Sequence, residues 1–268
     1  MSEEPLYTGK TLRIVDDKTK EVLVTTWTGD RQKIVQVPID TQYYSPDAMV
    51  RDDNMAEVLE ENRKLKSARI EGLRVVINFL NSINVPYWIS DGTLLAAYRD
   101  NGVMIERDVD CDVSIMENDL PKVWENRHLL PKEYRLNTTS CGTDWSEPEN
   151  LYGKFVLIPG KNMAKKFSIH DTRDYSSIVH HTLPPEIDIY TFRECEDGII
   201  QSNYAKISQH IHLRKWQKDW IFPLKEMPFE GITCLGPNDP KQYLEELFGY
   251  IGHNAVWNTE TKKYEPKK

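Results

Sequence analysis

Residues 90–115, SDGTLLAAYRDNGVMIERDVDCDVSI, decide the class of fold. Their last part predicts a β-strand, because Asp108, Asp110 and Asp112 alternate with apolar residues. Alternate side chains of a strand share one face, so the three carboxylates would lie side by side and repel one another. A cation bound between them would remove this repulsion, and the alternative is a solvated strand face.

An EF-hand loop also places carboxylates at this spacing. Asp108, Asp110, Asp112 and Asp119 fit its ligand positions, but Val113 stands where the loop needs glycine. The apolar alternation is also typical of a strand, so the sequence argues against an EF-hand.

The residues before the aspartates predict a strand, a turn and a short helix. VPYWI, residues 85–89, fits a buried strand, and the helix that follows is expected to stop at Gly102. Gly92 lies at the turn, where a missing side chain lets a ligand approach the backbone. The amides of Thr93 and Leu94 would begin the helix, and a helix N-terminus is a natural phosphate site.

A further carboxylate comes from EIDIYTF, residues 186–192, which predicts another buried strand. Burying an isolated charge costs several kcal/mol, so a buried Asp188 must be paired or bound to a cation. By itself Asp188 fits an ion pair as well as a site. Together with Asp110 and Asp112 it offers hard oxygen ligands from two strands, which suit Mg²⁺ or Mn²⁺ rather than zinc.

Composition narrows the class of protein. The 268 residues carry a formal net charge of −8, which argues against a general nucleic-acid binder. No apolar stretch approaches the length of a membrane span, and the first residues do not resemble a signal peptide. The four cysteines form no C-x-x-C pair, which favours reduced thiols. We therefore expect a cytoplasmic protein, and the sequence leaves its oligomeric state open.

The pattern divides the chain into a small β-rich N-terminal extension, residues 1–50, and a larger domain, residues 51–268. Three strands are expected in the extension, within 11–17, 20–29 and 32–39. The larger domain begins with a long helix, capped at Asn54 and ending near Asn84. Later expectations are a helix around 118–128, strands at 151–159 and 229–236, a helix after the turn at 237–239, and a frayed tail at 262–268.

The order of these motifs resembles the LicD family of the nucleotidyltransferase superfamily, which includes bacterial phosphocholine transferases, fukutin and fukutin-related protein. The family's G-[ST]-L-L-G-x-x-R segment is matched by Gly92, Thr93, Leu94, Leu95 and Arg99, and the aspartate cluster follows after a short spacer. The resemblance covers roughly residues 70–257, including FEGITCLGPNDPKQYLEELFG. This chain departs from the family pattern where Glu106-Arg107 replaces Pro-Trp, Ala96 replaces glycine and Phe248 replaces tyrosine.

The resemblance implies an α+β fold with a nucleotidyltransferase-like mixed β-sheet flanked by helices. It also implies transfer of a phospho-alcohol, phosphocholine or a polyol phosphate, to a glycan hydroxyl from a CDP-activated donor such as CDP-choline or CDP-ribitol. Asp110 and Asp112 would hold Mg²⁺ or Mn²⁺ at the donor's diphosphate. Asp188 would be a further ligand or the base that accepts the acceptor's proton.

Five residues are expected to bind substrate or to orient it. Ser90, Gly92 and Thr93 would surround the phosphates, and Asp108 would orient the site from the start of its strand. Arg99 fits either a bidentate phosphate contact or a structural ion pair.

Other chemistry-bearing residues admit a functional and a structural interpretation. The basic stretch 159–174, which carries Lys161, Lys165, Lys166, His170 and Arg173, fits a mobile loop over an anionic substrate or a solvated surface loop. The pairs His180-His181 and His210/His212 could bind metal, although no carboxylate motif accompanies them. Trp216, Trp220 and Trp257 fit stacking on a sugar or base, or packing in the core.

Three rival functions remain open. An Asp-x-Asp glycosyltransferase would hold a UDP-sugar, but it would not need the upstream glycine turn or the Asp188 strand. Nucleotidyl transfer to a small molecule would differ in the leaving group, so product analysis decides. A non-catalytic glycan-binding module would commonly have lost metal carboxylates, and this chain keeps them.

Overall fold

The structure, a computed structural model, describes three strands within residues 12–38 and residues 55–140, 165–175, 177–179, 184–202, 214–258, 260–261 and 263–267. The strands β1 (Leu12–Val15), β2 (Glu21–Thr28) and β3 (Arg31–Pro38) form an antiparallel sheet of their own. Their pairing agrees with the hairpin and third strand expected from the sequence. The division of the chain at residue 50 stays a prediction.

The main sheet has seven strands, and β8 (Glu186–Glu194) lies at its centre. On one side, β5 (Cys111–Met116) runs parallel to β8, and β4 (Tyr87–Ile89) runs antiparallel to β5. On the other side, β7 (Lys165–Asp171) pairs with the first half of β8 and β9 (Ile199–Ser202) with its end. The two outer strands are β6 (Tyr134–Ser140), beside β7, and β10 (Lys215–Gln217), beside β9. This mixed sheet with its helices confirms the predicted α+β class.

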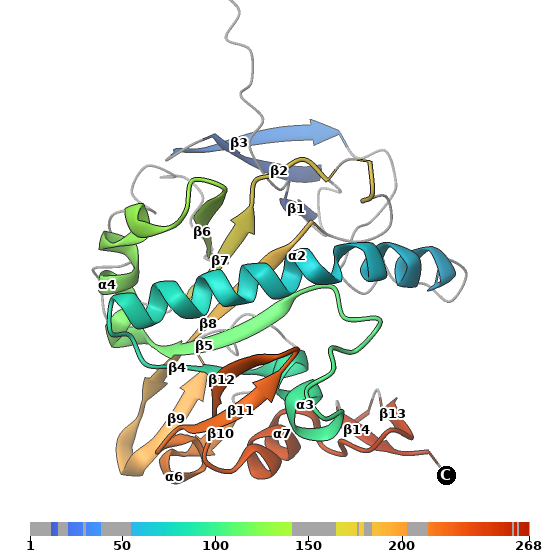
Figure 1. Cartoon of the computed structure of the whole chain (residues 1–268), viewed down its shortest axis with the longest axis vertical. Helices are drawn as coiled ribbons and strands as arrows, with labels where there is room; N and C mark the ends of the chain where they lie inside the picture. Colours follow the sequence, from blue (N-terminus) through green and yellow to red (C-terminus); the bar gives the residue numbers. More distant parts are fainter. Residues whose placement is uncertain are drawn as a thin grey trace, which may run out of the picture.

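The long helix α2 (Met55–Ser82) lies across the main sheet (Figure 1). Apolar residues at helical spacing, among them Leu65, Leu73 and Leu80, are fully buried, and the helix contacts β5, β7 and β8. It ends two residues before the predicted end, and Asn84 then takes a left-handed backbone angle of φ 50°. The predicted cap at Asn54 lies outside the described residues.

Three further helices and one hairpin pack around β4, β5 and β10. They are α3 (Asp91–Arg99), α6 (Lys218–Ile221), α7 (Pro240–Phe248) and the pair β11 (Lys225–Phe229) and β12 (Ile232–Gly236). An aromatic cluster fills the space between them: the Trp216 ring lies 5.3 Å from Phe192 and 5.2 Å from Tyr243. Of the two interpretations of Trp216, the structure therefore shows core packing. The helix near residue 118 is the short α4 (Leu120–Glu125).

Three expectations about strands need correction. The aspartate strand begins at Cys111 rather than Asp108, because its pairing with β8 begins at Cys111 opposite Ile187. The segment 229–236 is half of the β11–β12 hairpin, since Glu230 and Gly231 both adopt positive φ and reverse the chain. The tail is not frayed: β13 (Ala255–Asn258) and β14 (Lys263–Pro266) form a hairpin. The strand expected at 151–159 lies outside the described residues.

Candidate functional site

Parallel pairing of β5 with β8 places two carboxylates side by side. Asp112 and Asp188 are directly opposite each other and are only 5% and 2% exposed. Asp110, just before β5, is half-buried and lies beside this pair. Ligand oxygens of Asp110, Asp112 and Asp188 lie within 4.8 Å of one another, and these three residues form the carboxylate group of the candidate site. Three such charges repel strongly where water is scarce, so the group could bind a metal ion, and its all-oxygen ligands suit a hard cation.

The turn between β4 and α3 is hydrogen-bonded to the aspartate strand. The Ser90 amide donates to the Asp112 carbonyl at 3.1 Å, and the Asp112 amide donates to Thr93 Oγ1 at 2.8 Å. Both Ser90 and Thr93 are buried. The Ser90 hydroxyl has no hydrogen-bond partner among the described residues, which leaves one buried polar group available beside the site. Contact of these side chains with phosphate stays a prediction.

The start of α3 differs from the expected one. The helix begins at Asp91, two residues earlier, so the Leu94 amide already donates to the Ser90 carbonyl at 2.9 Å. A phosphate at this terminus would therefore have to meet the amides that precede Leu94. Asp91 itself has φ 48°, in the left-handed region, which a non-glycine residue adopts at some cost.

Gly92 allows a close approach, but the group that approaches is the carboxylate of Asp108. A Cβ atom at Gly92 would lie 2.3 Å from Asp108 Oδ2. Burial, together with the charge of Asp110, raises the pKa of Asp108 well above its usual range, although the Val109 amide donates to Asp108 Oδ1 at 3.2 Å. Asp108 is thus close to the start of α3 and near enough to Asp110 to be affected by its charge, a position from which it could orient either.

A polar contact that was not predicted from the sequence joins α2 to the aspartate segment. Arg69 is fully buried, and its Nη1 donates to Asn62 Oδ1 at 2.9 Å and to the Asp108 carbonyl at 3.5 Å. Asn62 in turn donates to the Glu106 carbonyl at 2.8 Å. Burial lowers the pKa of Arg69, while nearby charges including Asp110 and Asp108 act to raise it. The signal was present in the sequence as a charged residue on an otherwise mostly apolar helix face.

Arg99 has the ion pair that the sequence left as one of two interpretations. Its Nε and Nη2 donate to both carboxylate oxygens of Asp100, at 2.9 and 2.7 Å. The same carboxylate lies 3.5 Å from His253 Nε2. A phosphate contact of Arg99 would have to compete with Asp100.

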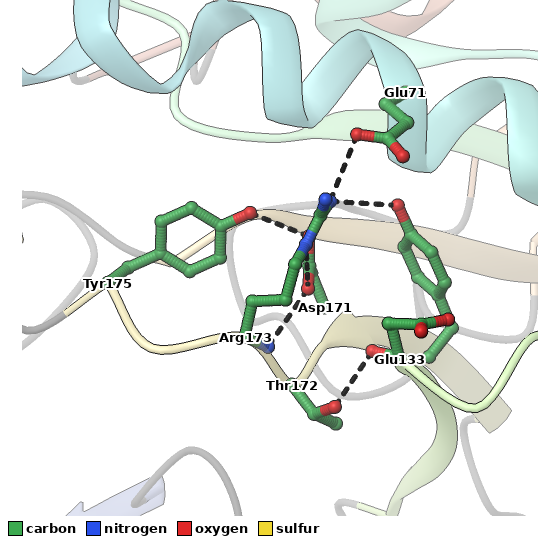
Figure 2. Close-up of polar contacts among 7 residues, drawn as sticks. Glu71, Glu133, Asp171, Thr172, Arg173 and Tyr175 are labelled. Carbon is green, nitrogen blue, oxygen red and sulfur yellow. Dashed lines mark hydrogen bonds and ion pairs between the residues drawn. The ribbon is translucent and has the colours of Figure 1, made fainter.

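The basic stretch 159–174 is not one loop, because Lys165–Asp171 forms β7. Figure 2 shows Arg173 bound to Asp171 and Glu71, and its Nη2 also donates to Tyr134 Oη at 3.3 Å. Tyr175 Oη donates to the same aspartate at 2.7 Å. Arg173 therefore joins the end of β7 to α2, which is a structural role. Lys161 and the four histidines proposed as metal ligands lie outside the described residues.

The other two tryptophans differ in exposure. Trp220 packs against the core, whereas Trp257 on β13 is 44% exposed and meets the Tyr264 ring edge-on.

The structure also bears on the cysteines and on membrane spans. Among the described cysteines, Cys111, Cys195 and Cys234 are free thiols. None of the described helices is both long and apolar enough to span a bilayer.

Comparison with known proteins identifies the same region. Residues 84–239, more than half of the chain, match the family model of the LicD/FKTN/FKRP nucleotidyltransferase domain. Over 179 residues the chain is 24% identical to the human ribitol 5-phosphate transferase FKRP, an overlap of 67% of this chain and 30% of the relative. Over 164 residues it is 26% identical to an uncharacterized protein of Rickettsia prowazekii, which is 60% of this chain and 46% of that protein. The chain thus spans less than half the length of these relatives.

Proposed function

Because the chain belongs to the LicD/FKTN/FKRP family, we propose that it transfers a phospho-alcohol from a CDP-activated donor to a glycan hydroxyl. The name of the FKRP relatives, ribitol 5-phosphate transferase, supports a polyol phosphate as the transferred group, with phosphocholine as the alternative. The observation that carries the proposal is the in-register pair Asp112 and Asp188 with Asp110 beside it.

The three carboxylates fit Mg²⁺ or Mn²⁺, because they offer only hard oxygen ligands, two from paired strands of the sheet and one from the residue just before β5. Such an ion would neutralise charge on the donor's diphosphate. Asp188 is held in a strand whose flanking Ile187 and Ile189 are buried, and the Tyr190 hydroxyl donates to its Oδ2 at 3.4 Å. This rigid placement suits either of its proposed roles, metal ligand or acceptor of the proton from the attacking hydroxyl.

The residues around the carboxylates have proposed roles toward substrate. The N-terminus of α3, at Gly92 and Thr93, would face the phosphates with its amides. The Ser90 hydroxyl, which has no hydrogen-bond partner among the described residues, would donate to a phosphate oxygen. Asp108, close to both the helix terminus and Asp110, would orient the site, and Arg99 would contact phosphate only by leaving Asp100.

A panel of CDP-linked donors, incubated with the protein, Mg²⁺ and candidate glycans, tests the proposal through release of CMP. We expect CMP from one donor, and loss of that release in the double variant Asp110→Asn/Asp112→Asn. The exposed Asp219, changed to asparagine, is the matched control and should leave the rate unchanged. Release of pyrophosphate from a nucleoside triphosphate instead would show nucleotidyl transfer, and turnover of a UDP-sugar would show glycosyl transfer.

A further inference from the structure

A cavity of about 740 Å³ reaches the segment that leads into the aspartate strand, with Asp108 in its wall. Its other walls come from the end of α3, the segment before β5, the end of α7 and the β13–β14 hairpin. Figure 1 shows α3, α7 and this hairpin gathered at one end of the molecule. The volume falls in the range of ordinary small-molecule sites, so the cavity has room for a substrate of nucleotide or sugar size.

The charges around the cavity favour an anion. Its lining contains three basic side chains, Arg99, Arg107 and His253, and one carboxylate, Asp108. Arg99 and His253 both contact the carboxylate of Asp100, so each already has a partner within the protein. Arg107 is exposed and has no hydrogen bond or ion pair with any described residue. It is therefore the basic group of the lining that is available to a ligand, and it adjoins Asp108 in the chain.

The rest of the lining suits the carbon-containing part of a ligand. Phe248, Tyr250 and Tyr264 contribute aromatic rings, and the Tyr250 hydroxyl is already bound to Asn254 Oδ1 at 2.7 Å. Aromatic surface of this kind binds a base or the apolar face of a sugar. Arg107 and Phe248 are also two positions at which this chain departs from the family pattern, so both changes fall in one cavity.

We propose that this cavity binds an organic phosphate, with the anionic group beside Arg107 and the carbon-containing part against the aromatic residues. The proposed function names the two possible sources of such a ligand, and the inference rests on it to that extent. One is the nucleotide half of the donor, and the other is a phosphorylated polyol. Arg107 is then a specificity-determining residue, because it selects ligands that carry a negative charge at this point.

Isothermal titration of the full chain in Mg²⁺ with CMP, and separately with ribitol 5-phosphate, tests this inference without turnover. We expect at least one of them to bind, Arg107→Ala to weaken that binding about tenfold, and Arg107→Lys to retain most of it. Arg74→Ala, at an exposed arginine of α2, is the matched control and should bind like the unmodified protein. Ala255→Trp should weaken binding by filling the cavity, whatever the charge of the ligand.

The outcomes separate the sources and the two proposals. Arg107-dependent binding of CMP alone assigns the cavity to the donor's nucleotide, and binding of ribitol 5-phosphate alone assigns it to a phosphorylated polyol. If neither binds, or if Arg107→Ala binds as tightly as Arg74→Ala, the cavity proposal is overturned even where CDP donors are turned over. If organic phosphates bind through Arg107 but no CDP donor releases CMP, the proposed function fails and the cavity proposal stands.

Discussion

At the scale of single residues, the candidate site is a problem of charge balance. Asp110, Asp112 and Asp188 hold ligand oxygens within 4.8 Å of one another, and Asp108 adds a further carboxylate nearby. Arg69 is a buried cation that interacts electrostatically with Asp108 and Asp110. In the absence of a metal ion, this arginine offsets part of the repulsion between the carboxylates.

Replacing Arg69 with methionine should therefore destabilise the metal-free protein by about 2–4 kcal/mol, because it leaves Asn62 Oδ1 without its donor and removes the positive charge near Asp108 and Asp110. A bound divalent ion would replace the lost charge, so Mg²⁺ should stabilise the variant more than the unmodified protein. Urea unfolding in EDTA and in Mg²⁺ measures both effects. Equal stabilisation by Mg²⁺ in the two proteins would show that Arg69 does not balance these carboxylates.

Gly92 is a residue of the candidate site where a single added methyl group should lower the rate. Its added Cβ would meet Asp108 Oδ2 at 2.3 Å, so Gly92→Ala must displace that carboxylate from the helix terminus. We expect at least a tenfold lower rate of CMP release, with about 1–3 kcal/mol lost from the free energy of unfolding. Gly72→Ala is the control. Gly72 lies within α2, and its added Cβ would meet Ile187 at 3.4 Å, which is an ordinary van der Waals distance. Unchanged turnover in Gly92→Ala would show that the position of Asp108 does not matter for the reaction.

At the scale of elements, Arg173 links the end of β7 to α2 through Glu71, and the Asp171 carboxylate holds Arg173 in place. Burial acts to raise the pKa of Asp171, but hydrogen bonds from Arg173 and Tyr175 lower it below the ordinary value (Figure 2). A lowered folded-state pKa means that the stabilisation is present above the unfolded-state value and is lost as the pH falls through the folded one. Arg173 is 41% exposed, so solvent screens part of the interaction.

Asp171→Asn should accordingly lower the free energy of unfolding by about 1–2 kcal/mol at neutral pH. The difference from the unmodified protein should stay constant above about pH 5 and shrink below about pH 4, because the Asp171 carboxyl takes up a proton first in the unfolded chain and only at lower pH in the folded one. Guanidinium unfolding across this pH range measures it, with the exposed Asp197→Asn as control. A difference that does not change with pH would assign the loss to packing instead of charge.

The junction of α7 with the C-terminal hairpin requires glycine. Gly249 has φ +85°, and a Cβ there would lie 2.8 Å from the Tyr264 carbonyl. Gly249→Ala should cost about 1–3 kcal/mol and move β14 away from α7, so binding of organic phosphate in the cavity should weaken with it. Gly231→Ala is a useful comparison, because φ is also positive but nothing lies within 4 Å of its Cβ. Equal effects of the two substitutions would mean that backbone strain alone matters.

At the scale of the whole molecule, the sequence predicted those features that depend on residues close together in the chain. The strand at 186–192, the long amphipathic helix and the grouping of Asp110 and Asp112 all follow from periodicity and residue type. The start of β5 did not, because it depends on where β8 begins to pair with it. Arg69 and the cavity were also missed, since each joins segments that are far apart in the chain and meet only after folding.

The predicted boundary near residue 50 can be tested on the whole molecule. The buried apolar cluster is built from residues 73–247, and β1, β2 and β3 pair only with one another among the described strands. Residues 51–268 alone should therefore unfold cooperatively, with a free energy of unfolding within about 1 kcal/mol of the full chain, and should release CMP at the same rate. Differential scanning calorimetry and the donor assay measure the two quantities. Loss of the cooperative transition would mean that the extension contributes to the core, whereas loss of activity alone would place it at the substrate.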